Sequence, residues 1–143
     1  VAKGAIECFV GGADLGFEKF MHIKARFNDL EPHAAVLVAT VRALKSHGGV
    51  RRRDLESPNE DAVRKGLPNL EHMVGVIRSF GLPVVVAVNT FPSDTPGEMA
   101  IVKEHAEAAG ASAAVESRIA GTSAEASTGT SRRSPNPSHR TCS

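Results

Sequence analysis

The pattern of apolar and polar positions predicts strands and helices over the first 116 residues of the 143-residue chain. Two short runs are continuously apolar, AAVLVAT at 34–40 and LPVVVAV at 82–88. Strands of a parallel sheet have this pattern because both of their faces are buried. A later run, ASAAVES at 111–117, favours a third strand.

Between these runs, apolar residues recur at every third or fourth position, as on the buried face of a helix. We expect Asp14 to cap the first helix, and the sequence Thr-Pro-Gly-Glu at 95–98 to form a capping box on the last. Pro68 falls inside another periodic segment, and we expect it to end one helix and begin the next. The predicted helices cover residues 14–27, 59–65, 68–80 and 95–110.

Strands and helices in this order predict an α/β fold, part of a doubly wound parallel sheet flanked by helices. The composition changes at residue 117: of the 27 residues from 117 to 143, 11 are Ser or Thr, and Ile119 is their one large aliphatic residue. Such a segment buries too little apolar surface to offset its ordering entropy. We therefore predict a folded unit over 1–116 and a disordered, low-complexity tail over 117–143.

Charge and composition exclude several classes of protein. The chain has 17 basic and 16 acidic side chains and neither Trp nor Tyr, which argues against a nucleic-acid partner. No run of about 18 apolar residues is present, so no membrane-spanning helix is expected. Cys8 and Cys142 have neither metal-ligand nor disulfide-framework spacing, which favours a reducing compartment and predicts no metal site.

The carboxyl ends of parallel strands are where ligands bind in open sheets, which makes two segments candidate sites. The segment that follows the first strand along the chain contains Arg42, Lys45 and His47, and then Gly48 and Gly49. Basic side chains beside exposed backbone amides suit an anion such as phosphate or carboxylate. A solvated loop with basic side chains explains the same residues, and the run RRRD at 51–54 is most simply a solvated charge run.

Behind the second strand, the sequence NTFPSDT begins at Asn89. Phe91 precedes a proline, Pro92, and is therefore held extended, which suits a flat ring in a cleft. A ring folded back over the sheet edge remains the alternative. Asp94 either makes the turn or contacts a ligand, and turn-making is the commoner role for such a residue.

Several long segments resemble formate–tetrahydrofolate ligase, also called formyltetrahydrofolate synthetase. They are GADLGFEKFMHIKAR, VLVATVRALKSHGG and GLPNLEHMVGVIRSFGLPVVVAVNTFPSDTPGE, in the same order and with matching spacing. The resemblance covers roughly residues 12–115, as an internal fragment of that enzyme. It implies the family's large, P-loop-NTPase-like α/β domain.

The resemblance also implies a reaction. Enzymes of this family use ATP with Mg²⁺ to phosphorylate formate, and formyl phosphate then passes its formyl group to N10 of tetrahydrofolate, giving 10-formyltetrahydrofolate. Formate is a poor electrophile, and the mixed anhydride supplies a good leaving group. Monovalent cations activate some members, and full-length members are often homo-oligomers. The implied compartment is the cytoplasm, with the mitochondrion as the alternative.

Residue roles carry over where motifs match. Phe91 and Pro92 match the Phe-Pro of N-x-F-P-x-D, whose aromatic ring packs against the pterin, and Asn89 and Asp94 belong to the same motif. The motifs V-R-A-L-K-x-H-G-G and A-D-L-G-x-E-K-F lie near the cleft without a firm role. They match Arg42, Lys45, His47, Asp14 and Lys19.

The chain departs from the family at both ends. Residues 8–12 read CFVGG where the family reads Glu-Ala-Gly-Phe-Gly, so residues 1–11 look foreign, and the sequence contains no G-x-x-x-x-G-K-[ST] loop. The tail is explained either as a natural flexible segment or as a frameshift. We therefore expect the isolated chain to be inactive, and a non-catalytic folate-binding or assembly remnant is the alternative function.

Overall fold

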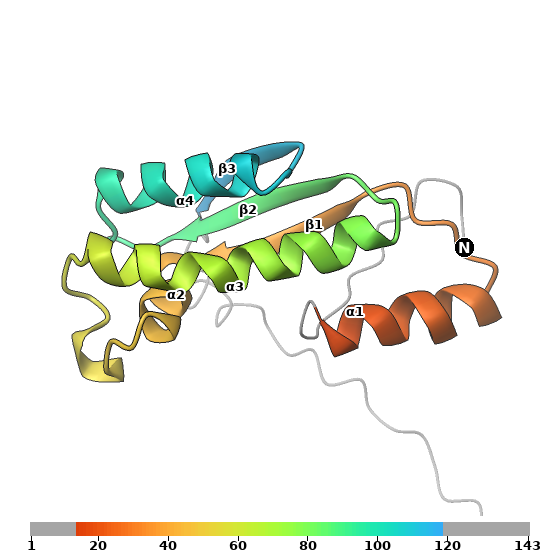
Figure 1. The fold of residues 1–143 in the computed structure, drawn as a ribbon, viewed down its shortest axis with the longest axis horizontal. Coiled ribbons are helices and arrows are strands. Elements are labelled where there is room, and N and C mark those ends of the chain that lie inside the picture. The colour runs from red at the N-terminus through yellow and green to blue at the C-terminus, as the bar shows by residue number, and fades with distance from the viewer. Residues whose placement is uncertain (1–13, 119–143) are drawn as a thin grey trace, which may run out of the picture.

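The computed structural model describes residues 14–118, in which helices and parallel strands alternate (Figure 1). The strands are β1 (Ala35–Thr40), β2 (Val84–Thr90) and β3 (Ala113–Arg118). The helices are α1 (Leu15–Lys19), α2 (Val41–His47), α3 (Glu60–Ser79) and α4 (Pro96–Ala108), with a π-helical stretch η1 (Phe20–Ala25) and a 3₁₀ turn η2 (Arg52–Asp54). The predicted α/β fold with a parallel sheet is confirmed.

The three strands form one sheet in the order β1-β2-β3, and both pairs are parallel. The register places Thr40 beside Asn89 and Asn89 beside Ser117, so the carboxyl ends of all three strands meet at one edge. Figure 1 shows α2 and the loop before α4 at this same end of the sheet, whereas α1 lies at the other end. The sheet therefore brings the two candidate strand ends together.

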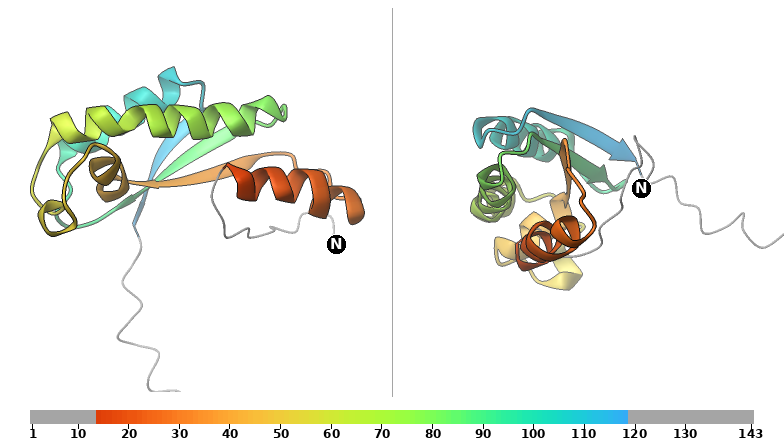
Figure 2. Two further views of the ribbon diagram at one scale, coloured as in Figure 1. Left: turned by 60° about the horizontal axis from the view of Figure 1, so that its bottom comes forward. Right: turned by 90° about the vertical axis from the view of Figure 1, so that its right-hand side faces the viewer.

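The core lies between the sheet and the helices that cover one of its faces. Figure 2 shows α3 and α4 on the same side of the sheet. Along β2, Val84, Val86 and Val88 are fully buried against these helices, as the two-residue period of a strand requires. The opposite face is uncovered among the described residues, where Val36 and Val38 are 66% and 58% exposed.

Helix α3 corrects the prediction that Pro68 separates two helices, because it runs unbroken through the proline. Its buried positions continue across Pro68 at spacings of three and four residues, so one continuous helix packs against the core. Pro68 removes the N–H group that would bond to the carbonyl of Arg64, but both residues are exposed. Water can hydrate that carbonyl. The buried side chains are Ala62, Val63, Leu67, Leu70, Val74 and Ile77.

Other boundaries also differ from the prediction. Helix α2 was not expected, although Thr40 supplies a cap whose hydroxyl accepts a hydrogen bond from the N–H of Ala43 at 3.1 Å. Asp14 occupies the N-cap position of α1, but its side chain makes no capping bond. Strand β3 extends to Arg118, and residues 1–13 and 119–143, with both cysteines, lie outside the described residues. Within 14–118, no helix is long and apolar enough to cross a membrane.

A buried ion pair joins the amino ends of α3 and α4 to α2. The Lys45 ammonium lies 2.6 Å from the Glu98 carboxylate, and neither side chain is exposed. Lys45 also donates to the carbonyl oxygens of Leu55 and Ser57, at 3.3 and 3.0 Å. Glu98 accepts from the N–H of Asn59 at 2.8 Å, so every group of the pair has an internal partner.

The other oxygen of Glu98 completes the predicted capping box of α4, which is confirmed. It accepts from the N–H of Thr95 at 3.0 Å, while the Thr95 hydroxyl accepts from the N–H of Glu98 at 3.3 Å. Burial alone raises the pKa of a carboxyl group. The hydrogen bonds from Asn59, Lys45 and Thr95 outweigh this effect, and the pKa of Glu98 lies below its ordinary value of 4.5.

Helices α2 and α3 approach closely at Gly66, where a Cβ atom would collide with the Leu44 carbonyl oxygen. We expect Gly66→Ala to lower the free energy of unfolding by about 1–3 kcal/mol, because the helices must move apart. Gly75 on the same helix has open space at its Cβ position, so Gly75→Ala should raise stability by about 0.5–1 kcal/mol. Urea unfolding measures both, and equal effects would contradict the close approach.

Replacing Lys45 should be far more costly than replacing an exposed basic residue. We expect Lys45→Met to lower the free energy of unfolding by about 3–5 kcal/mol, because the Glu98 charge stays buried without its cation. Arg53→Met is the matched control, since the pair between Arg53 and Asp54 is exposed, and it should cost less than about 1 kcal/mol. Similar losses in the two variants would show that the buried pair does not hold the fold.

The charge of Glu98 should make stability depend on pH. Its pKa is lower in the folded chain than in the unfolded chain, so its contribution is complete above the unfolded value near 4.5 and disappears as the pH falls through the folded pKa. Urea unfolding of the wild type and Glu98→Gln should therefore differ most at neutral pH and converge under acid. A difference that stays constant down to pH 3 would rule out this role.

Candidate functional site

The loop after β2, residues 91–94 (the Phe91 loop), is closed by Asp94. One oxygen of its carboxylate accepts from the N–H of Phe91 at 2.9 Å, and the N–H of Asp94 donates to the carbonyl of Phe91 at 3.0 Å. Asp94 therefore makes the turn, one of the two roles that the sequence left open. Its other oxygen, Oδ1, is buried and has no hydrogen-bond partner among the described residues.

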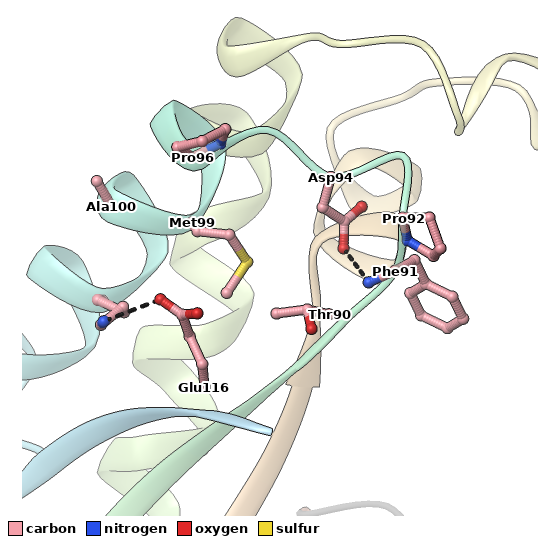
Figure 3. Close-up of a pocket in the computed structure, with 9 residues that line it drawn as sticks. Thr90, Phe91, Pro92, Asp94, Pro96, Met99, Ala100 and Glu116 are labelled. Carbon is pink, nitrogen blue, oxygen red and sulfur yellow. Dashed lines mark hydrogen bonds and ion pairs between the residues drawn. The ribbon is translucent and has the colours of Figure 1, made fainter. Parts of the chain in front are cut away.

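A surface cavity of about 690 Å³ lies beside this loop, between the end of β2, the first turns of α4 and β3. Figure 3 shows Met99 and Thr90 at this cavity with Glu116 on the neighbouring strand. Lys103 and Glu116 form an ion pair of 3.1 Å there, and both side chains are partly exposed. With the Asp94 carboxylate, the cavity combines an apolar surface with a few polar groups, as small-molecule sites do.

Phe91 belongs to the cavity lining, yet its ring points away from Met99 and Glu116 (Figure 3). The Arg42 guanidinium lies over this ring, 4.2 Å from its centroid. Arg42 also contacts Ser93 and Glu56. The ring thus stands at the strand end, half-buried, with a cation over one face, and Phe91 is among the residues that line the cavity.

The structure brings some of the predicted site residues together and separates others. Arg42 and Asn89 lie at the same end of the sheet as the Phe91 loop. Lys45 does not face this site, because its ammonium is buried and held by Glu98; this corrects its placement in an anion-binding cleft. The exposed side chain of His47 lines a separate cavity of about 90 Å³ beside β1 and α3.

Asp14 and Lys19 are also distant from the loop, because both belong to the α1 segment at the opposite end of the sheet (Figure 1). Sequence reasoning missed Glu98 as a buried partner and Lys103 with Glu116 as a pair at the cavity. The capping-box pattern could have identified Glu98 as structural. No sequence signal connects Lys103 to Glu116, because the pair forms between different elements.

Metal-ligating side chains do not form a cluster among the described residues. Among residues 14–118, no group of three or more His, Cys, Asp or Glu side chains is placed to hold a metal ion. Helix α4 begins directly after the Phe91 loop with Pro96, which has no N–H group, and the N–H of Glu98 donates to the Thr95 hydroxyl. The apolar surface and the few polar groups of the cavity suit an organic ligand.

Comparison with known proteins agrees with the geometry and the motifs. A sequence model described as formate–tetrahydrofolate ligase matches residues 8–131. A formate–tetrahydrofolate ligase of Sphingobium sp. (strain NBRC 103272 / SYK-6) is 58% identical over 113 residues, which is 79% of this chain and 20% of that protein. Proteins of the same name from Methylorubrum extorquens (strain PA1) and Staphylococcus carnosus (strain TM300) are 59% and 57% identical.

The latter two alignments cover 65% and 67% of this chain and 17% of each relative. The chain thus spans about a fifth of the length of these curated relatives. The matched residues include α2, the Phe91 loop and α4, the elements that build the candidate site. By the extent of these matches, the chain belongs to the formate–tetrahydrofolate ligase family.

Proposed function

We propose that this chain forms one side of the tetrahydrofolate site of a formate–tetrahydrofolate ligase, with Asn89, Phe91, Pro92 and Asp94 at the folate. The observation that carries the proposal is the 690 Å³ cavity at the end of β2, whose lining includes Phe91, Pro92 and Asp94 of the matched motif. A cavity that combines apolar surface with a few polar groups suits a flat organic ligand.

Tetrahydrofolate has the chemistry that such a site requires. Its pterin is a flat ring system with amino and ring N–H donors, which can approach a carboxylate while the ring packs on apolar side chains. Pro92, Pro96 and Met99 supply apolar surface in the cavity lining. The flat ring of Phe91, with Arg42 on one of its faces, offers the stacking surface.

The reaction of the whole enzyme consists of phosphate steps and a folate step. ATP transfers its γ-phosphoryl group to a formate oxygen, and the N10 atom of tetrahydrofolate attacks the resulting formyl phosphate; phosphate leaves and N10 loses a proton. The described residues hold the folate and orient N10, and we assign the phosphate steps to other parts of the enzyme. Alone, the chain binds folate without turnover.

A chimera tests this function. The matched 113-residue segment of the Sphingobium ligase is replaced by its counterpart from this chain, and 10-formyltetrahydrofolate formation is measured with ATP and formate. We expect the chimera to be active and the isolated chain to be inactive. In the chimera, Asp94→Asn should raise the KM for tetrahydrofolate by about tenfold, because a neutral amide holds the turn at Phe91 less strongly than the carboxylate does.

Glu104→Gln, an exposed change elsewhere on α4, is the control and should leave the KM unchanged. A folded chimera that binds folate without turnover would instead favour the non-catalytic remnant. A chimera that neither binds folate nor reacts, while remaining folded, would overturn the proposed function. Turnover by the isolated chain would overturn the expected division of labour.

A further inference from the structure

Arg42 makes two contacts with the Phe91 loop and a third with Glu56. Its guanidinium lies over the Phe91 ring at 4.2 Å from the centroid. The Nη2 atom donates to the Ser93 hydroxyl at 3.2 Å and lies 3.1 Å from the Glu56 carboxylate. Arg42 stands at the start of α2, so these contacts tie the loop to a helix with a buried face.

These contacts restrict what else Arg42 can do. The guanidinium carbon lies over the ring, and Nη2 is shared between Ser93 and Glu56. The Nε atom is buried without a partner among the described residues, so an anion arriving from solvent cannot reach it. The guanidinium is thus held against Phe91 and Ser93, which places Arg42 to act through the ring.

Fixing the ring matters because Phe91 projects from a strand end, where the core does not hold it. A ring that is free to change rotamer loses that freedom when a ligand stacks on it, and the lost entropy weakens binding. A cation on one face holds the ring before the ligand arrives and directs the ligand to the other face. Planar stacking by arginine is specific to its guanidinium, so lysine is an incomplete substitute.

We propose that Arg42 is a positioning residue: it stacks on Phe91 and holds its ring as the surface on which the pterin packs. This inference rests on the proposed folate site. It assigns to Arg42 a role in the recognition of the flat heterocycle, separate from the recognition of any negative charge on the ligand.

Two ligands separate positioning from charge recognition: 5-formyltetrahydrofolate, which carries the negatively charged glutamate, and 6-methylpterin, which lacks it. The dissociation constants for the full chain are measured by calorimetry. We expect Arg42→Gln to weaken both ligands by the same factor, about fivefold, and Arg42→Lys to weaken both by less. Arg53→Gln, at an exposed arginine of η2, should change neither. A loss confined to 5-formyltetrahydrofolate would overturn the proposal.

A double-mutant cycle tests whether Arg42 acts through the ring. In the Phe91→Leu background, Arg42→Gln should cause no further weakening of 6-methylpterin binding, because no ring is left to hold. Equal effects of Arg42→Gln in the presence and absence of the ring would overturn the positioning role. Arg42→Lys retains the charge and provides the same comparison if Arg42→Gln does not fold.

A measurement without ligand separates this inference from the proposed function. Aromatic ¹³C NMR signals of Phe91, assigned with Phe91→Leu, should move in Arg42→Gln and stay in place in Arg53→Gln. If the wild type binds neither ligand, the proposed folate site fails, and these signals still decide whether Arg42 holds the ring. Unchanged Phe91 signals in Arg42→Gln would overturn the inference even if folate binds.

Discussion

The ion pair between Lys45 and Glu98 is the constraint on which the arrangement of the described helices depends. Its two charges come from α2 and α4, and its hydrogen bonds reach the residue that caps α3. Moving a carboxylate and an ammonium out of water is costly, and only a full set of partners offsets that cost. The pair therefore permits one arrangement of these helix ends. The Phe91 loop leads directly into Thr95 and α4, so the same ion pair also fixes the position of this loop.

The parallel register has a complementary effect, because it aligns the strand ends to which these helices connect. Thr40 and Asn89 are neighbours in the sheet, so the segments that follow them start side by side. This explains how Arg42 reaches a loop some fifty residues later in the chain, at Ser93. The strand order and register thus bring the segments of the site together, and contacts between individual side chains then fix their positions.

The sequence predicted the elements better than it predicted their contacts. The apolar runs gave β1 and β2, and the Thr-Pro-Gly-Glu pattern gave the start of α4, because these signals are local. The predicted break at Pro68 was wrong, because the free energy gained by one continuous buried face outweighs the loss of one hydrogen bond. Lys45 looked like a surface cation, and its partner lies 53 residues away on another element. Pairings between distant elements leave no periodic pattern, so the cation on Phe91 could not be predicted either.

The face of the sheet opposite α3 and α4 is apolar and exposed among the described residues. Among the described residues, Val36, Val38 and Val115 are 66%, 58% and 46% exposed on this face. Beside this strip, the outer edge of β1 has no strand partner among the described residues, and such surfaces favour association with other chains. A segment or subunit that covers this strip would remove from water the apolar area that the described helices leave exposed, and would thereby stabilise the sheet.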